Sequence, residues 1–466
     1  MAKIIPMRQK TKEERRVVKV EKQVRYRKGF DYRLIMALVA LVALGLVMVF
    51  SSSYYMAEVG GKDQAYYFLK QLLCVGIGAV LMFAFMHLDY HTFEELPWKK
   101  YKWLTPFKNI RPYWLILVFG FVTLLLVFVP GIGQNINGSH RWINIGVSIQ
   151  PSEIMKMSII IFMACMIGRR PARMRYFSDG ILPFLIMLGA ACAIIYMQPN
   201  FSAIICIAAL VMALLYIGGA KLSHLGMIVG VVGIALVIFI AAAPYRANRL
   251  LAWTDPWGDS DTGHQLRQSL ISIGSGGVFG KGLGNSMQKM LYLPYRESDF
   301  IFAILAEELG LVGCVVVIGL FAVLIWRGIV AAIQAPDLTG TLLAAGATAM
   351  LAIQVVVNIG VNVGLLPSTG VVLPFISYGG SSVLIFMSMM GLVLNVGRQG
   401  KAVVPAAEKK KGFDWELTLP KEIPIQKRGK KRRSAAAPGV ANRSGHAPYV
   451  QGARQKQQPA RKRKTS

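Results

Sequence analysis

Residues 293–330 read LPYRESDFIFAILAEELGLVGCVVVIGLFAVLIWRGIV, a polar loop that leads directly into a long apolar segment. About thirty mostly apolar residues follow Asp299, interrupted by Glu307 and Glu308 near the start. A segment of this length can cross the hydrocarbon core of a bilayer as one helix. The whole chain is 54% hydrophobic and 16% charged, with a mean hydropathy of +0.48. This composition indicates an integral membrane protein rather than a soluble enzyme.

Ten apolar segments predict an all-α membrane protein, a polytopic bundle of about ten transmembrane helices. They lie near residues 33–54, 67–88, 113–130, 151–168, 180–197, 201–218, 223–243, 301–330, 340–365 and 380–396. A long loop, residues 244–300, separates the seventh segment from the eighth. We therefore predict a basic tail at residues 1–32, a membrane domain at residues 33–396 and a second basic tail at residues 397–466.

Most of the net charge of +29 lies in these tails. Residues 1–33 contain twelve Lys or Arg against four acids, and residues 397–466 contain nineteen against four. Both tails are predicted to be disordered and to be attracted to anionic lipid headgroups. Nucleic-acid binding is not expected, because neither interleaved aromatic residues nor a recognisable binding fold accompanies the cations.

Basic residues also orient the spans, since cytoplasmic loops are enriched in Lys and Arg. Clusters of cations follow the second and fourth segments: Lys99, Lys100, Lys102, Lys108 and Arg111, then Arg169, Arg170, Arg173 and Arg175. Both termini are therefore predicted to be cytoplasmic, and no cleavable signal peptide is expected because the first span is too long and apolar. Three longer segments then face outside, at residues 131–150, 244–300 and 366–379, and the chemistry is expected there.

Asp299 lies at the boundary between the large outer loop and the eighth span. An ionised group at a membrane boundary is costly unless it borders water or a cation, which makes Asp299 a candidate functional residue. The structural alternative is that it caps the helix or lies in interfacial water.

The first outer segment supplies two more candidates, Arg141 and Trp142, just before the fourth span. A guanidinium suits phosphate oxygens, whereas Trp142 also fits an interfacial aromatic belt. Glu153 and Lys156 follow, three residues apart on one helical face, and predict an ion pair within the membrane. Either the pair is a structural contact at the start of the helix, or Glu153 holds Lys156 in place to contact an anionic ligand.

The second outer segment contains several cations, and the third contains residues that interrupt a helix. Arg246, Arg249 and Lys289 could contact an anionic substrate or lipid headgroups. The glycines between residues 274 and 284 permit close backbone approach, a weak signal for phosphate binding. Residues 366–382 contain two prolines and several small residues, which predicts a broken or re-entrant segment. Asn358 and Asn362 share one face of the ninth span, a pattern typical of polar contacts between helices.

Cysteine and histidine give no sign of a metal centre. The five cysteines, Cys74, Cys165, Cys192, Cys206 and Cys314, all fall within predicted spans and form no CxxC pair, so they indicate buried apolar packing. The six histidines have no ligand spacing. We therefore expect no metal site built from these side chains alone.

Several motifs in order, over residues 35–396, resemble the SEDS family (shape, elongation, division and sporulation). The resemblance is closer to its division branch, FtsW, and to the spore-cortex members. The motifs are RWI at residues 141–143, QPSE at 150–153 with Lys156, YR at 245–246 with Arg249, PW at 256–257, GLGNS at 282–286 with QK at 288–289, YLP at 292–294, DFIFA at 299–303, EELG at 307–310 and LPFISYGGSS at 373–382.

The resemblance implies a peptidoglycan glycosyltransferase of about ten spans in a bacterial plasma membrane, acting in division or in spore-cortex synthesis. Its substrate would be lipid II, and its partners a class B penicillin-binding transpeptidase and other divisome membrane proteins. The residue essential for polymerisation in this family maps onto Asp299. Residues implied to bind substrate are Arg141, Trp142, Lys156, Arg246, Arg249, Lys289 and Ser377.

The implied reaction needs few groups. Inverting transfer to a 4-hydroxyl requires one base, and a pyrophosphate leaves without an acid if cations hold its charge. A divalent cation, Mg²⁺ or Mn²⁺, could assist. The chain departs from the family at Tyr295, where a Glu is usual, and at Asn200, where an Asp is usual. Glu297 either replaces the missing Glu or that acid is dispensable. A lipid II flippase and a non-catalytic division scaffold remain as alternatives.

Overall fold

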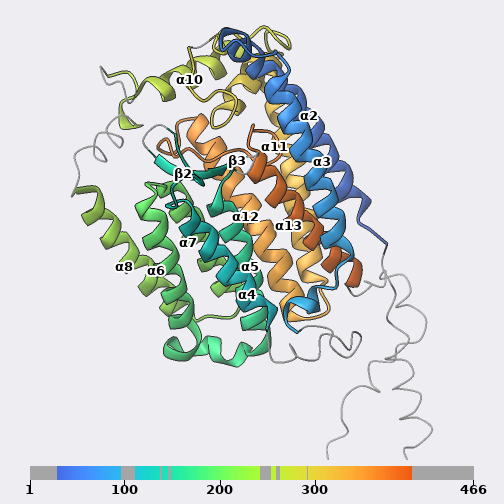
Figure 1. The fold of residues 1–466 in the computed structure, drawn as a ribbon, viewed down its shortest axis with the longest axis vertical. Helices are drawn as coiled ribbons and strands as arrows, with labels where there is room; N and C mark the ends of the chain where they lie inside the picture. The colour runs from blue at the N-terminus through green and yellow to red at the C-terminus, as the bar shows by residue number, and fades with distance from the viewer. Residues whose placement is uncertain are drawn as a thin grey trace, which may run out of the picture. The chain divides into compact units, whose positions relative to one another are not determined.

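The computed structural model describes residues 29–95, 111–136, 139–144, 148–241, 253–258, 263–290 and 292–400 (Figure 1). Both tails and residues 242–252, with Arg246 and Arg249, lie outside these ranges. The described helices are α2 (Tyr32–Val59), α3 (Tyr66–His87), η1 (Tyr90–Phe93), α4 (Pro112–Leu126), α5 (Pro151–Arg169), η3 (Pro171–Arg175), η4 (Phe177–Ile181), α6 (Leu182–Met197), α7 (Phe201–Ile217), α8 (Leu222–Ala241), α10 (His264–Gly276), α11 (Ile301–Ile333), α12 (Leu338–Asn362) and α13 (Gly380–Gln399).

These helices confirm the predicted all-α membrane fold. Among the described residues, seven helices are long and apolar enough to cross a bilayer: α2, α3, α5, α6 taken together with η4, α11, α12 and α13. Three shorter apolar helices, α4, α7 and the start of α8, complete the set of ten predicted from hydropathy. The described cysteines lie inside these helices and form no disulfide.

The local sequence explains where several helices begin. Proline at the first position starts α4 and α5, where its missing N–H costs nothing. Asp31 caps α2 by accepting from Leu34 N, and Asp337 caps α12 by accepting from Gly340 N at 2.6 Å. Asn200 caps α7 in the same way through Ala203 N.

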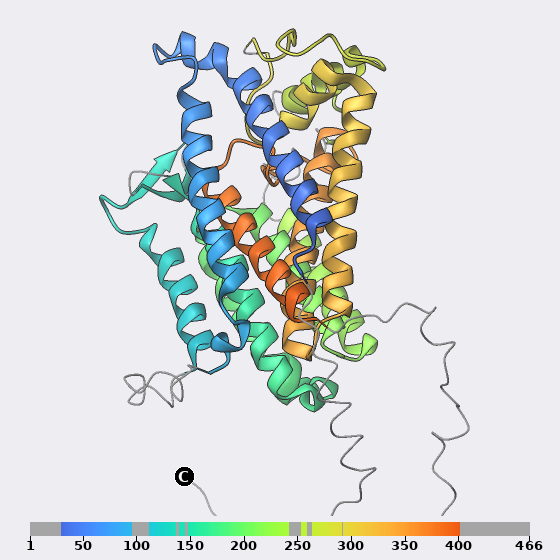
Figure 2. The ribbon, with the colours of Figure 1, turned by 90° about the vertical axis from the view of Figure 1, so that its right-hand side faces the viewer.

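The centre of the bundle is formed by α5, α12 and α13, whose spans are mostly buried within the protein. Figures 1 and 2 show α13 running along α3, with α12 and α11 beside it. By contrast, only 17% of the α3 span is buried, and large side chains such as Val80 and Phe83 are exposed on it. In a bilayer these exposed apolar faces contact lipid.

A small antiparallel sheet fills part of the first outer segment and was not predicted. Strand β1 (Gly133–Ile136) pairs with β2 (Ser139–Asn144), which pairs with β3 (Ser148–Ile149). Gly133 lies opposite Ile143, and Ile143 lies opposite Ile149. The sheet leads directly into Pro151, so it places Arg141 and Trp142 beside the start of α5.

The predicted eighth span is not one straight helix. Gly310 has φ +67° and breaks α11. The glycine-rich stretch before it packs against this break: Lys281 N donates to Glu307 O and Gly282 N donates to Glu308 O, both at 3.0 Å. A Cβ on Gly276 would lie 2.0 Å from Ala306 O. The close backbone approach expected of these glycines is therefore made to α11.

Candidate active site

Asp299 lies in a tight loop immediately before α11. The backbone carbonyl of Tyr295 stabilises this loop. It accepts hydrogen bonds from Ser298 N at 3.1 Å, Asp299 N at 3.0 Å and Phe300 N at 3.2 Å. Tyr295 itself has φ +54°, a left-handed conformation that is uncommon for a bulky residue. The N-cap of α11 is Phe300 and has no side-chain cap hydrogen bond. The carboxylate of Asp299 is therefore not used as a helix cap.

Two asparagines of α12 hold the backbone of Asp299. Asn358 Nδ2 donates to Asp299 O at 2.8 Å, and Asn362 Nδ2 donates to the same oxygen at 3.0 Å. Asn362 Oδ1 also accepts from Ala303 N at 3.1 Å, in the first turn of α11. The predicted contact between helices is present, and it is made at the candidate catalytic residue.

The third outer segment, residues 366–379, is irregular, as its prolines predicted, and most of residues 371–379 are buried. Ser377 Oγ donates to Ser298 O at 2.6 Å, and Tyr378 N donates to Glu297 O at 2.8 Å. Gly370 has φ +73°, and a Cβ there would lie 3.4 Å from Asp299 Oδ2. The segment thus lies against the backbone just before Asp299 and against the Asp299 carboxylate.

The surroundings of Asp299 favour its protonated form more than water does. Burial, together with repulsion from Glu297, raises the pKa of Asp299 to about 6, although a hydrogen bond from Ser298 and the charge of Arg141 act in the opposite direction. A carboxylate with a pKa near 6 is basic enough to accept a proton and still ionised at neutral pH.

Arg141 is the cation that acts on Asp299 from the first outer segment. Its Nε donates to Gln198 O at 3.3 Å and its Nη2 donates to Pro199 O, which fixes the side chain against the joint between α6 and α7. Trp142, opposite Gln134 in the sheet, is half-buried.

The predicted ion pair in α5 is present and buried. Lys156 Nζ donates to Glu153 Oε1 at 2.6 Å, and both side chains are almost fully enclosed. Three buried polar atoms, two in the first turn of α5 and one at the N-cap of α7, have no hydrogen-bond partner within the described residues: Ser152 Oγ, Glu153 Oε2 and Asn200 Nδ2. Buried polar atoms without partners are rare in proteins, so these atoms could bind water or a polar ligand.

Comparisons with known proteins now identify the family. The model described as "Cell cycle protein", FTSW_RODA_SPOVE, matches residues 32–402. The chain belongs to the FtsW/RodA/SpoVE family. Stage V sporulation protein E of Bacillus subtilis is 40% identical over 80% of this chain and 98% of that protein. A probable peptidoglycan glycosyltransferase FtsW of Geobacter is 39% identical over 79% of this chain and 96% of that protein.

Solved structures agree with this assignment. A chain of a peptidoglycan synthase complex, studied for the coordination of polymerization and crosslinking, has a TM-score of 0.62 and 28% identity, covering 79% of this chain and 98% of that one. The rod shape determining protein RodA of Thermus thermophilus has a TM-score of 0.56 and 26% identity over 80% and 99%. The SEDS resemblance predicted from the motifs is therefore confirmed.

Within this FtsW/RodA/SpoVE chain, the two consecutive acids of α11, Glu307 and Glu308, are fully buried and hydrogen-bonded to other parts of the protein. Glu307 accepts from Lys281 Nζ at 2.7 Å and from Ser286 Oγ at 2.6 Å. Glu308 accepts from Lys289 Nζ at 2.9 Å and from Ser51 Oγ at 2.7 Å. These contacts tie the glycine-rich loop and α2 to the break in α11.

This arrangement places Lys289 differently from expectation. Its side chain is fully buried and its ammonium group is paired with Glu308, above the ring of Tyr54. In this conformation Lys289 holds the loop to α11 and its side chain is enclosed within the protein. Ser377 is also buried and positions the Asp299 loop. Arg246 and Arg249 lie outside the described residues.

Sequence reasoning missed Arg296, two residues after the family motif Leu-Pro. Its side chain is 3% exposed. Nη1 donates to Leu293 O at 3.3 Å, while Nε and Nη2 have no partner within the described part of the chain. Burial lowers the pKa of Arg296, and the charge of Glu297 partly offsets this effect. Arg296 could have been identified from the sequence, because it is a cation that lies close to Asp299.

Proposed function

We propose that this chain is a peptidoglycan glycosyltransferase that polymerises lipid II by inverting transfer at the outer face of the plasma membrane. The observation that carries the proposal is the position of Asp299. Its backbone is held by Asn358 and Asn362, Arg141 acts on its charge, and its pKa is raised to about 6. The names of the FtsW relatives support the same activity.

Asp299 is assigned as the general base. Its carboxylate accepts the proton of the acceptor sugar's 4-hydroxyl as that oxygen attacks the anomeric carbon of the donor. The bond to the lipid pyrophosphate breaks in the same displacement, so the configuration inverts. One carboxylate suffices, whereas glycoside hydrolases use two.

Cations stabilise the departing pyrophosphate in this proposal. Arg141 is the first candidate, because it acts on Asp299 electrostatically. Lys156 is a second candidate. Its Nζ lies 2.6 Å from Glu153 Oε1, so the ion pair partly neutralises the positive charge that it offers to the pyrophosphate. Arg246, Arg249 and Trp142 are proposed as further contacts to phosphate or sugar. The roles proposed for Lys289 and Ser377 require a conformation in which they leave their present partners.

A divalent cation is compatible with this site only if the substrate supplies ligands. Within the described ranges there is no group of three or more His, Cys, Asp or Glu residues that could hold a metal ion. Mg²⁺ is commonly bound by one or two carboxylates together with substrate phosphates. We propose that Glu297, whose charge acts on Asp299, is the residue that would hold Mg²⁺ or Mn²⁺ together with the substrate phosphates, which would neutralise charge on the pyrophosphate and leave Asp299 free as the base.

We further propose that the enzyme works with a class B penicillin-binding transpeptidase. Support comes from the related chain solved within a peptidoglycan synthase complex. The basic loops favour cytoplasmic termini, and the tails are proposed to bind anionic lipid headgroups and other divisome membrane proteins.

The test is polymerisation by the purified full-length protein in detergent or nanodiscs. Labelled lipid II is supplied with and without the co-purified transpeptidase, and products are separated by gel electrophoresis. We expect glycan strands longer than the dimer. Transport of lipid II across vesicles with no polymer under any condition would contradict the proposal.

A further inference from the structure

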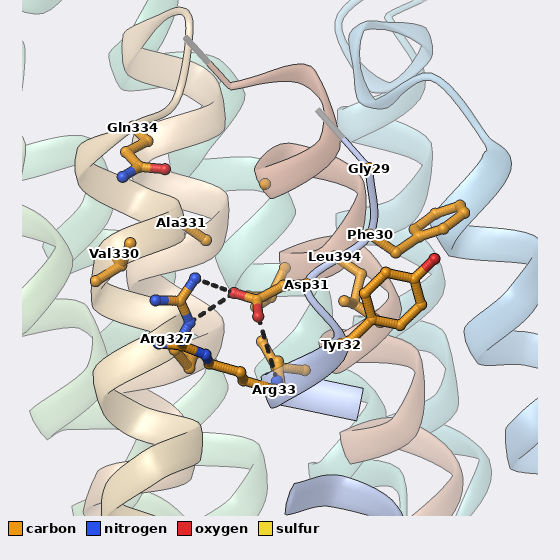
Figure 3. Close-up of a pocket in the computed structure, with 13 residues that line it drawn as sticks. Gly29, Phe30, Asp31, Tyr32, Arg33, Arg327, Val330, Ala331, Gln334 and Leu394 are labelled. Carbon is orange, nitrogen blue, oxygen red and sulfur yellow. Dashed lines mark hydrogen bonds and ion pairs between the residues drawn. The ribbon is translucent and has the colours of Figure 1, made fainter. Parts of the chain in front are cut away.

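A cavity of about 460 Å³ lies where α2 begins and where α11 and α13 end (Figure 3). Asp299 precedes the opposite end of α11. From the break at Gly310 to Arg327, α11 rises on the order of 25 Å. The cavity is therefore separate from the candidate active site.

The charges at this cavity are unequal. Figure 3 shows Arg327 of α11 reaching Asp31, and Arg327 Nε donates to Asp31 Oδ2 at 2.6 Å, so these two charges compensate each other. Arg33 also lines the cavity, is exposed and has no ion pair within the described residues. Arg398 does not line the cavity but lies near it, over the ring of the lining residue Phe30 at 5.5 Å. The cavity therefore has an excess of positive charge and suits an anion.

Apart from Arg327 and Gln334, the wall that α11 and α13 give to the cavity is apolar. Val330, Ala331, Val393, Leu394 and Gly397 of α11 and α13 form this wall. A ligand that fits here has an anionic end and an apolar end.

Exposed side chains around the cavity mark the level of the membrane surface. Tyr32 is 71% exposed and Trp326 is 54% exposed, as aromatic residues at the headgroup level commonly are. Met36, at 72%, extends this surface along α2 toward the middle of the membrane as an apolar side chain. An acyl chain leaving the cavity would find an apolar path on it.

We propose that the cavity binds an anionic glycerophospholipid from the leaflet at this end of the bundle. The lipid phosphate pairs with Arg33, its glycerol group lies on the wall formed by Val330 and Leu394, and its acyl chains follow Met36 along α2. Charge complementarity and the mixed polar and apolar lining favour this ligand over a free anion. This site is distinct from general attraction of headgroups to the basic tails.

The experiment compares lipid binding by variants of the full-length protein. Delipidated protein is titrated with phosphatidylglycerol or phosphatidylcholine, and bound lipids are counted by native mass spectrometry. We expect preferential binding of phosphatidylglycerol. Arg33→Gln should weaken it roughly fivefold, the effect of one cation near an anionic headgroup, while Arg33→Lys should retain most of it. Arg175→Gln, at another exposed arginine, is the matched control and should change nothing.

A second variant tests the apolar wall without altering charge. A Cβ on Gly397 would meet only Ala331 Cβ, at an ordinary 3.6 Å, so Gly397→Leu should fold and fill the cavity. It should weaken phosphatidylglycerol binding as well. Because every variant keeps both tails, their contribution cancels in the comparison. Thermal unfolding in phosphatidylcholine verifies that each variant is folded.

Three results would overturn the proposal. The first is equal binding of phosphatidylglycerol and phosphatidylcholine. The second is an equal loss for Arg33→Gln and Arg175→Gln, which would indicate nonspecific surface charge. The third is full displacement of the lipid by inorganic phosphate in the binding assay, which would reveal a site for a free anion.

Discussion

Replacing Asn358 by Leu tests whether α12 positions the carboxylate of Asp299, the proposed base. The amide donates to Asp299 O at 2.8 Å and to Val371 O at 2.7 Å, and Val371 is buried. Leu has a similar size but donates nothing. Asp299 O retains Asn362, at 3.0 Å, whereas Val371 O loses this donor. A buried group left without its partner costs about 1–3 kcal/mol.

The effect on catalysis should exceed this loss of stability. A displacement of about 1 Å at a reacting group can cost about a hundredfold in rate. We therefore expect Asn358→Leu to lower kcat for lipid II polymerisation by about 10- to 100-fold, with a smaller effect on KM, because the backbone of Asp299 loses one of its two amide donors. The measurements are initial rates with purified protein and thermal unfolding of the same preparation.

Gln354 provides the matched control. It lies one turn earlier on α12, is 1% exposed, and its Oε1 has no hydrogen-bond partner within the described residues. Gln354→Leu should leave kcat and stability close to those of the unmodified protein. If Asn358→Leu is destabilised but polymerises at the unmodified rate, the amide is a structural contact and the positioning argument is wrong.

Three further predictions concern the same region. Polymerisation should slow as pH falls through about 6, because the pKa of Asp299 is raised to about 6 and the base must be ionised; Glu297→Gln should move the midpoint of the kcat–pH profile to lower pH, and an unchanged midpoint would remove Glu297 as a cause. Gly370→Ala should reduce kcat, since φ is +73° and the new Cβ would lie 3.4 Å from Asp299 Oδ2, while unchanged kinetics would show that the carboxylate faces elsewhere. Glu308→Gln should destabilise the fold by about 3–5 kcal/mol because it leaves Lys289 buried and unpaired. The double variant with Lys289→Met should unfold at a higher temperature than Glu308→Gln, and equal melting temperatures would contradict the buried pair.

The membrane fold could be predicted because hydropathy is a local property. Each span is a continuous apolar segment, and the Glu153–Lys156 pair follows from a spacing of three residues on one helix. The broken segment before α13 was signalled by its own prolines, Pro367 and Pro374.

The details of the site depend on contacts between distant residues. Asn358 and Asp299 are 59 residues apart, and Lys289 and Ser51 are 238 apart. No local pattern tells whether an amide on α12 bonds another helix or the active-site loop. The role of the glycines near Gly276 was open for the same reason. A backbone that approaches a phosphate and a backbone that approaches α11 both require glycine, so the residue type does not tell which contact is made.

The most direct test of the central claim is polymerisation by Asp299→Asn. The variant keeps the size of the side chain and the backbone hydrogen bonds from Asn358 and Asn362, but it removes the base. We predict that it folds with an unchanged melting temperature, still binds lipid II and forms no glycan polymer at any pH. Polymerisation at the unmodified rate would show that Asp299 does not accept the proton.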